Sequence, residues 1–70
     1  MNEAGGRSRG EQYARLFRKA GVFAGKGELA AAIAALEQGV ELARRLGDVD
    51  MERIFTEQIA THRREMSEDD

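Results

Sequence analysis

The chain has 70 residues with no cysteine, no proline and one histidine, and its formal net charge is −2. A chain of this length forms one small domain, and without cysteine it holds neither a disulfide nor a thiolate metal site. The many Ala, Leu, Glu and Arg residues favour helix, so we predict an all-α fold.

The two halves of the chain carry opposite charge. Residues 1–27 hold six basic and two acidic side chains, whereas residues 28–70 hold five basic and eleven acidic ones. The chain as a whole is therefore not a basic nucleic-acid binder. No apolar run reaches the roughly 20 residues that a membrane span needs, and residues 1–10 lack the apolar core of a secretory signal. We expect a cytoplasmic protein that does not bind a membrane.

A first helix is predicted after residues 1–7, which hold two adjacent glycines and no apolar periodicity and so predict a disordered lead-in. Ser8 can begin the helix, because its hydroxyl can accept from the backbone N–H of Glu11 in a capping box. The Gly-Lys-Gly step of residues 25–27 should end it. The apolar stripe of this helix consists of Tyr13, Leu16, Phe17, Ala20, Phe23 and Ala24.

Two further helices follow the first. The second should begin near Glu28 and stop at Gly47, and either Asp48 or Asp50 can cap the third. Residues 67–70 predict a frayed acidic tail, which leaves a three-helix domain over residues 8–66. Turns this short make successive helices antiparallel neighbours, in either an open array or a closed bundle.

The Gly-Lys-Gly step superficially resembles a phosphate-binding loop. Such a loop needs G-x-x-x-x-G-K-[ST] after a β-strand, but here the spacing from Gly21 is one residue short and Gly27 replaces the hydroxyl residue. His62 has only Glu65 as a nearby carboxylate on its helix, and no hydroxyl residue has a base partner. We therefore predict no enzyme activity, no cofactor and no metal.

Small residues recur at set positions in the first two helices. Ala20, Gly27-Glu28, Ala32 and Gly39 have spacings that resemble a tetratricopeptide repeat, and the resemblance extends from Leu16 to about Ala60. It implies helices that close together through small residues. On that register the close-packing positions are Ala20, Ala32, Gly39 and Ala60.

The resemblance covers one repeat and one extra helix, whereas repeat arrays need about three repeats. It therefore implies a small bundle, or a dimer whose second subunit supplies the missing helix. Gly39 supports close packing independently, because a glycine within a helix costs about 1 kcal/mol relative to alanine and the approach of a neighbouring backbone is the usual compensation.

The chain also has more large apolar side chains than three short helices need to bury. We therefore predict a protein–protein interaction module, an adaptor or regulator that forms a homodimer. The candidate interface residues are Tyr13, Phe17, Leu42, Leu46, Phe55 and Ile59.

A small nucleic-acid-associated regulator is the alternative. A basic set beside Tyr13 on the first helix could contact phosphates. This set consists of Arg7, Arg9, Arg15, Arg18 and Lys19. The acidic remainder of the chain weighs against it.

Overall fold

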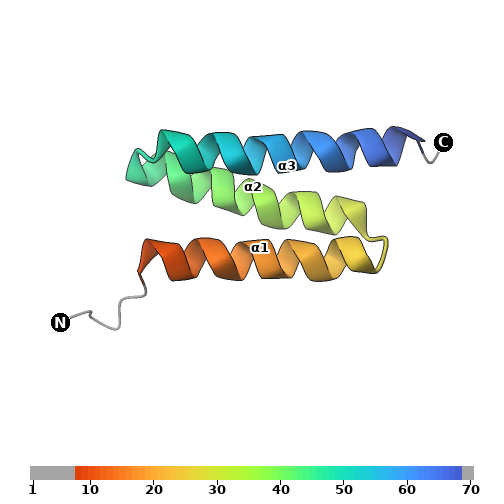
Figure 1. The fold of residues 1–70 in the computed structure, drawn as a ribbon, viewed down its shortest axis with the longest axis horizontal. Helices are drawn as coiled ribbons and strands as arrows, with labels where there is room; N and C mark the ends of the chain where they lie inside the picture. The colour runs from red at the N-terminus through yellow and green to blue at the C-terminus, as the bar shows by residue number, and fades with distance from the viewer. Residues whose placement is uncertain (1–7, 69–70) are drawn as a thin grey trace.

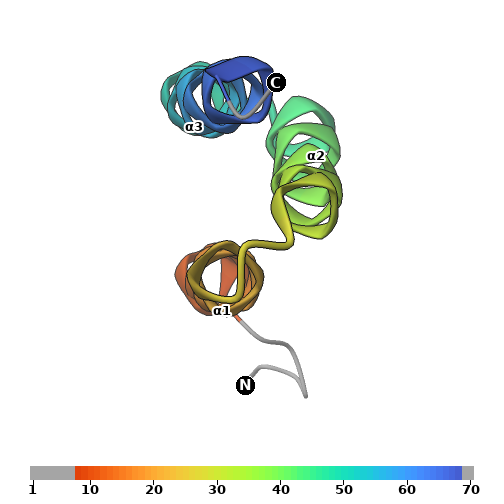
Figure 2. The ribbon, with the colours of Figure 1, turned by 90° about the vertical axis from the view of Figure 1, so that its right-hand side faces the viewer.

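Three antiparallel α-helices make up residues 8–68, the part of the chain that the computed structural model describes (Figure 1). They are α1 (Arg9–Gly25), α2 (Leu29–Leu46) and α3 (Val49–Glu68). α2 runs close beside both neighbours, whereas α1 and α3 meet through aromatic side chains. Seen from one end, the three helices form a curved layer with α1 and α3 on the same side of α2 (Figure 2). The prediction of an all-α, antiparallel three-helix fold is confirmed.

The ends of the domain differ from the predicted boundaries at one point. Residues 1–7, expected as a lead-in, and residues 69–70 of the expected tail lie outside the described residues. Ser67 and Glu68, also assigned to the tail, belong to α3. No glycine or proline precedes them to stop the helix, so it continues.

Local sequence signals set the starts of α1 and α3. The Ser8 hydroxyl accepts a 3.1 Å hydrogen bond from the Glu11 backbone N–H, as the capping box predicts. Of the two candidate caps for α3, Asp48 is the one used, because its Oδ1 accepts from the Met51 backbone N–H at 3.2 Å.

Both turns end the preceding helix in the same way. Gly27 and Gly47 have φ angles of 79° and 70°, in the left-handed region that favours glycine. The residue after each glycine donates its N–H to a carbonyl in the last turn of the helix, at 2.9 Å in the first case and 2.8 Å in the second. These hydrogen bonds form Schellman motifs. The Gly-Lys-Gly step is therefore a helix terminus.

The core is rich in alanine, so the helices approach each other closely. Ala32 and Ala43 of α2 are fully buried, and so is Phe55 of α3. The buried apolar residues are Tyr13, Ala20, Ala32, Ile33, Ala35, Leu36, Ala43, Phe55 and Ile59.

One aromatic ring joins all three helices. Phe55 of α3 lies over Gly39 of α2, where a Cβ would come within 2.5 Å of the ring carbon Cζ and 2.6 Å of Cδ1. The other side of the ring stacks on Phe17 of α1, with the ring centroids 4.4 Å apart and the planes 11° from parallel. Tyr13 of α1 meets the same ring at 5.6 Å and a tilt of 60°. The missing side chain at Gly39 thus makes room for the contact that links α1 to α3.

Gly39→Ala is expected to destabilise the protein. The added methyl collides with a ring that Phe17 and Tyr13 hold in place, and such overpacking costs about 1–3 kcal/mol, more than the gain of about 1 kcal/mol in helix propensity. Urea unfolding followed by circular dichroism measures the change.

Gly21→Ala is the matched control, because Gly21 is also within a helix but has nothing within 4 Å of an added Cβ. It should stabilise the protein by up to about 1 kcal/mol. Equal stabilisation by both substitutions would show that Phe55 does not depend on the space at Gly39.

Candidate functional site

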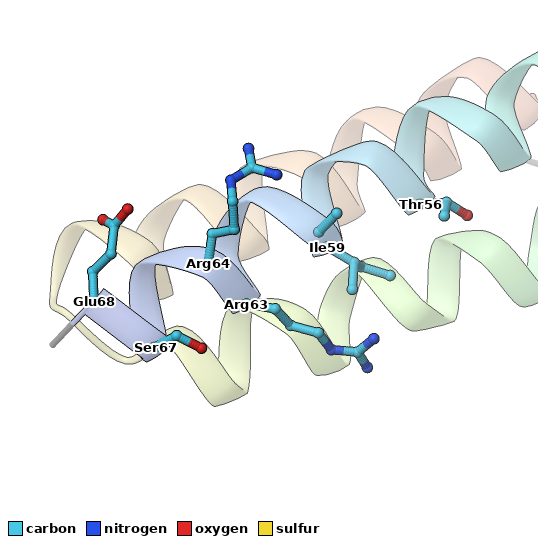
Figure 3. Close-up of a pocket in the computed structure, with 7 residues that line it drawn as sticks. Thr56, Ile59, Arg63, Arg64, Ser67 and Glu68 are labelled. Atoms are coloured by element: carbon cyan, nitrogen blue, oxygen red, sulfur yellow. The ribbon is translucent and has the colours of Figure 1, made fainter. Parts of the chain in front are cut away.

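One side of α3 is not covered by any other described helix. A shallow hollow on it is lined by Thr56, Ile59, Ala60, Arg63, Arg64, Ser67 and Glu68 (Figure 3). Ile59 is buried, and the other six are exposed. We define the outer face of α3 as the exposed residues that share this side by helical spacing: Arg53, Thr56, Glu57, Ala60, Arg64, Ser67 and Glu68.

The seam between α2 and α3 is spanned by two ion pairs. Arg63 Nη2 lies 3.2 Å from Glu37 Oε2, and Arg44 Nε lies 3.1 Å from Glu52 Oε2. These side chains are largely exposed, so each pair contributes at most about 1 kcal/mol. The pair with Glu37 places α2 beside the hollow, which Arg63 also lines.

Asp48 connects all three helices at the turn between α2 and α3. One carboxylate oxygen caps α3, and the other, Oδ2, accepts a 3.0 Å hydrogen bond from the hydroxyl of Tyr13 on α1. The backbone N–H of Asp48 closes the end of α2 through its bond to the Ala43 carbonyl. Arg9 Nη1 lies 3.8 Å from the same Oδ2. Asp48 is thus a structural residue with its acceptor atoms occupied.

This environment raises the pKa of the Tyr13 hydroxyl. Burial of the ring raises the pKa of Tyr13 above its ordinary value of 10.0, and the hydrogen bond to Asp48 and the negative charge of that carboxylate raise it further. The positive charge of Arg9 lowers the pKa of Tyr13. The neutral phenol is therefore the form that the fold stabilises.

The described residues hold little that could perform catalysis. His62 Nδ1 lies 3.2 Å from Glu65 Oε1 and forms a single imidazole–carboxylate pair. Within residues 8–68, no three His, Asp or Glu side chains come together in a group that could bind a metal ion. A single His–Glu pair lacks both the nucleophile and the oxyanion donors of an active site.

Three of the four predicted close-packing residues lie in the core. Ala20, Ala32 and Gly39 are buried, and Gly39 faces the ring of Phe55 rather than a neighbouring backbone. Ala60 is exposed, and none of the described helices packs over it. Close packing at Ala60 therefore stays a prediction that depends on a helix from a second subunit.

Half of the predicted interface residues are core residues. Tyr13, Phe55 and Ile59 are 6%, 0% and 7% exposed, so the interface prediction is wrong for them. Tyr13 and Phe55 are buried because the aromatic side chains of α1 and α3 meet. Phe17 and Leu42 are half-buried, and Leu46 is exposed.

Several exposed apolar residues were not singled out from the sequence. The largest exposed fractions belong to Val22 at 58% and Val49 at 70%, while Ile54 and Met66 are about 40% exposed. They belong to different helices or different sides of α3 and do not mark one patch. Of these, only the exposure of Val22 could have been predicted from the sequence, because Val22 lies opposite the apolar stripe of α1.

The basic residues of α1 do not form a site with Tyr13. Arg9 pairs with Asp48, while Arg15, Arg18 and Lys19 are exposed. Arg7 lies outside the described residues. Because Tyr13 is buried, its ring cannot stack on a nucleic-acid base, which removes the aromatic part of that hypothesis.

No family model, curated protein or solved structure matches this chain. The tetratricopeptide resemblance therefore stays a prediction from the residues that carry it. None of the described helices is both long and apolar enough to span a bilayer. The arrangement of the residues alone carries the functional argument.

Asp48→Ala is expected to destabilise the protein more than Tyr13→Phe. The alanine removes the cap of α3 and the acceptor for the Tyr13 hydroxyl, for about 2 kcal/mol in total, whereas the phenylalanine removes only the hydrogen bond, for about 1 kcal/mol. In the double variant the losses should fall short of additivity by about 1 kcal/mol, measured by urea unfolding.

Two substitutions serve as controls for Asp48. Asp48→Asn keeps one acceptor oxygen, which can still cap α3, while its NH2 group replaces the oxygen that accepts from Tyr13. It should therefore destabilise the protein less than alanine. Asp50→Ala removes the other candidate cap, whose carboxylate pairs only with the exposed Arg53, and should stay within about 0.5 kcal/mol of the unmodified chain. A loss at Asp50 equal to that at Asp48 would contradict the assignment of the cap.

The raised pKa of Tyr13 predicts a loss of stability in alkali. The unfolded chain releases the phenolic proton near pH 10.0 and the folded chain only at higher pH. The stability that the neutral phenol gives to the folded chain is therefore fully present below pH 10.0. It is lost as the pH rises towards the folded pKa of Tyr13. Because the chain has one tyrosine and no tryptophan, tyrosinate absorbance reports this group directly. Tyr13→Phe should flatten this part of the stability profile, and an unchanged profile would contradict the assignment.

Proposed function

We propose that this chain is a non-catalytic protein-interaction module that binds a helix of its partner along the outer face of α3. The observation that carries the proposal is the exposure of Ala60 in the hollow, on a side of α3 that no other described helix covers. Small side chains in the middle of an exposed helix face allow a second backbone to come close.

The composition of the outer face fits a helix better than other ligands. Thr56, Ala60 and Ser67 leave a shallow depression, and charged side chains of both signs border it (Figure 3). A polar rim around a less polar centre is the usual arrangement of a protein interface. A helix of mixed charge with small or apolar residues along one side would fill the depression and pair with the rim.

The spacing that resembles a tetratricopeptide repeat supports the same location. The resemblance places Ala60 where a further helix would pack, and the described chain has none there. An intermolecular helix would occupy this position without any change in the three helices of the chain.

A photo-crosslinking residue at position 60 tests the proposal in the native host. We expect position 60 to capture a discrete protein product, because the partner helix lies directly over it. Thr56→Arg should abolish the capture by blocking the same face. The product is identified by mass spectrometry.

Position 34 provides the matched control, since Ala34 is likewise an exposed alanine within a helix but belongs to α2. Ala14→Arg on α1 controls for the added charge. Capture from position 34 equal to that from position 60, or capture that Thr56→Arg leaves unchanged, would overturn the proposal.

A further inference from the structure

We infer that the helix bound by the outer face of α3 is the α3 helix of a second copy of this chain, packed antiparallel about a two-fold axis between residues 60 and 61. The inference rests on the proposed function and names its partner. It is carried by the order of charges along the outer face of α3.

Four charged side chains of the outer face are spaced at steps of four, seven and four residues, which places them on one side of the helix. In chain order they are Arg53, Glu57, Arg64 and Glu68. Read backwards from residue 68 to residue 53, the order of charges is the opposite, position by position, of the order read forwards. A helix with this pattern is complementary to its own antiparallel copy.

The two-fold axis follows from the same spacing. When residue 60 of one copy lies beside residue 61 of the other, Arg53 faces Glu68 of the second copy and Glu57 faces Arg64 of the second copy. Symmetry repeats both pairs, so four opposite-charge pairs form. Such self-complementarity is the requirement of an interface in which both copies use the same surface.

The parallel arrangement is disfavoured by the same residues. In register, each arginine would face an arginine and each glutamate a glutamate. Like charges side by side are destabilising. The charge order therefore selects the antiparallel dimer.

These charged groups are available for pairing. Within residues 8–68, Glu57 and Glu68 form no ion pair. Arg64 makes a 3.5 Å hydrogen bond to the Thr61 hydroxyl, and Arg53 lies 3.4 Å from the exposed Asp50. Exposed contacts of this kind are weak and can be exchanged for contacts across an interface.

The depression at the centre allows the two helices to approach. Ala60 lies next to the axis, and Thr56 and Ser67 lie on the side towards α2, where each also lines a hollow with α2 residues. A single helix face gives an interface at the small end of the usual range. We therefore expect a weak dimer whose population depends on protein concentration and falls as salt rises.

Two charge variants test the register. Arg53→Glu/Arg64→Glu makes the four positions acidic, and Glu57→Arg/Glu68→Arg makes them basic. Each variant alone should self-associate about 30-fold more weakly than the unmodified chain, because four pairs become repulsive. Mixed in equal amounts, the two should form a heterodimer, measured by sedimentation over a concentration series.

A third variant separates register from folding. Exchange of all four charges, Arg53→Glu/Glu57→Arg/Arg64→Glu/Glu68→Arg, restores the pairs at steps of four residues within the helix and every pair across the interface. It also places a glutamate beside Asp50, in a contact that is exposed and weak. It should dimerise like the unmodified chain. Circular dichroism confirms that each variant is folded.

Cysteine cross-linking tests the orientation independently, because the chain has no native cysteine. Ala60→Cys should form an intermolecular disulfide, since the two residues meet near the axis. Arg53→Cys should not, because the two copies of residue 53 lie about 22 Å apart along an antiparallel pair. Efficient cross-linking of both variants would indicate a parallel pair and overturn the inference.

Failure of this inference can be distinguished from failure of the proposed function. A monomer at every concentration, or charge variants that do not recover dimerisation when mixed, overturns the second copy as the partner. If position 60 still captures a different protein in the native host, the proposed function stands. Dimerisation of each charge variant alone, at the strength of the unmodified chain, also overturns the inference.

Discussion

The contact between Phe55 and the bare backbone at Gly39 holds the three helices together. The backbones of α1 and α3 each run close to α2, and the two helices meet through their aromatic side chains. A side chain at Gly39 would occupy the space of the Phe55 ring, and the stack with Phe17 would be displaced. The curvature of the layer, with α1 and α3 on one side of α2, follows from this shared ring (Figure 2).

Asp48 and the aromatic cluster reinforce the same end of the molecule. The start of α1, the end of α2 and the start of α3 come together there (Figure 1). Tyr13 belongs to both contacts, because its ring meets Phe55 and its hydroxyl meets Asp48. The second half of α3 has no equivalent tie to α1 among the described contacts. The contacts between α1 and α3 are thus concentrated towards one end, and the uncovered face of α3 extends away from them.

The sequence predicted the helices and turns well because their signals are local. The caps at Ser8 and Asp48 and the left-handed glycines depend on residues within one turn. The side-chain partners were harder to predict, because they depend on how each helix is rotated relative to its neighbours. Gly39 indicated a close approach, but the group that approaches is a ring from a third helix. Counting apolar residues therefore assigned Phe55 and Tyr13 to an interface when the chain buries them itself.

The outer face of α3 also limits which macromolecules can bind there. Its charges alternate, so a nucleic-acid backbone or an anionic membrane laid along Arg53 and Arg64 would also meet the carboxylates of Glu57 and Glu68. Polyanion binding requires basic groups that act together without such interruption. A protein helix can carry, at each position along its length, the charge opposite to the one it faces, and so pair with every charge of the outer face. An interleaved charge pattern is therefore specific for a structured partner, and the antiparallel copy of α3 has the required order.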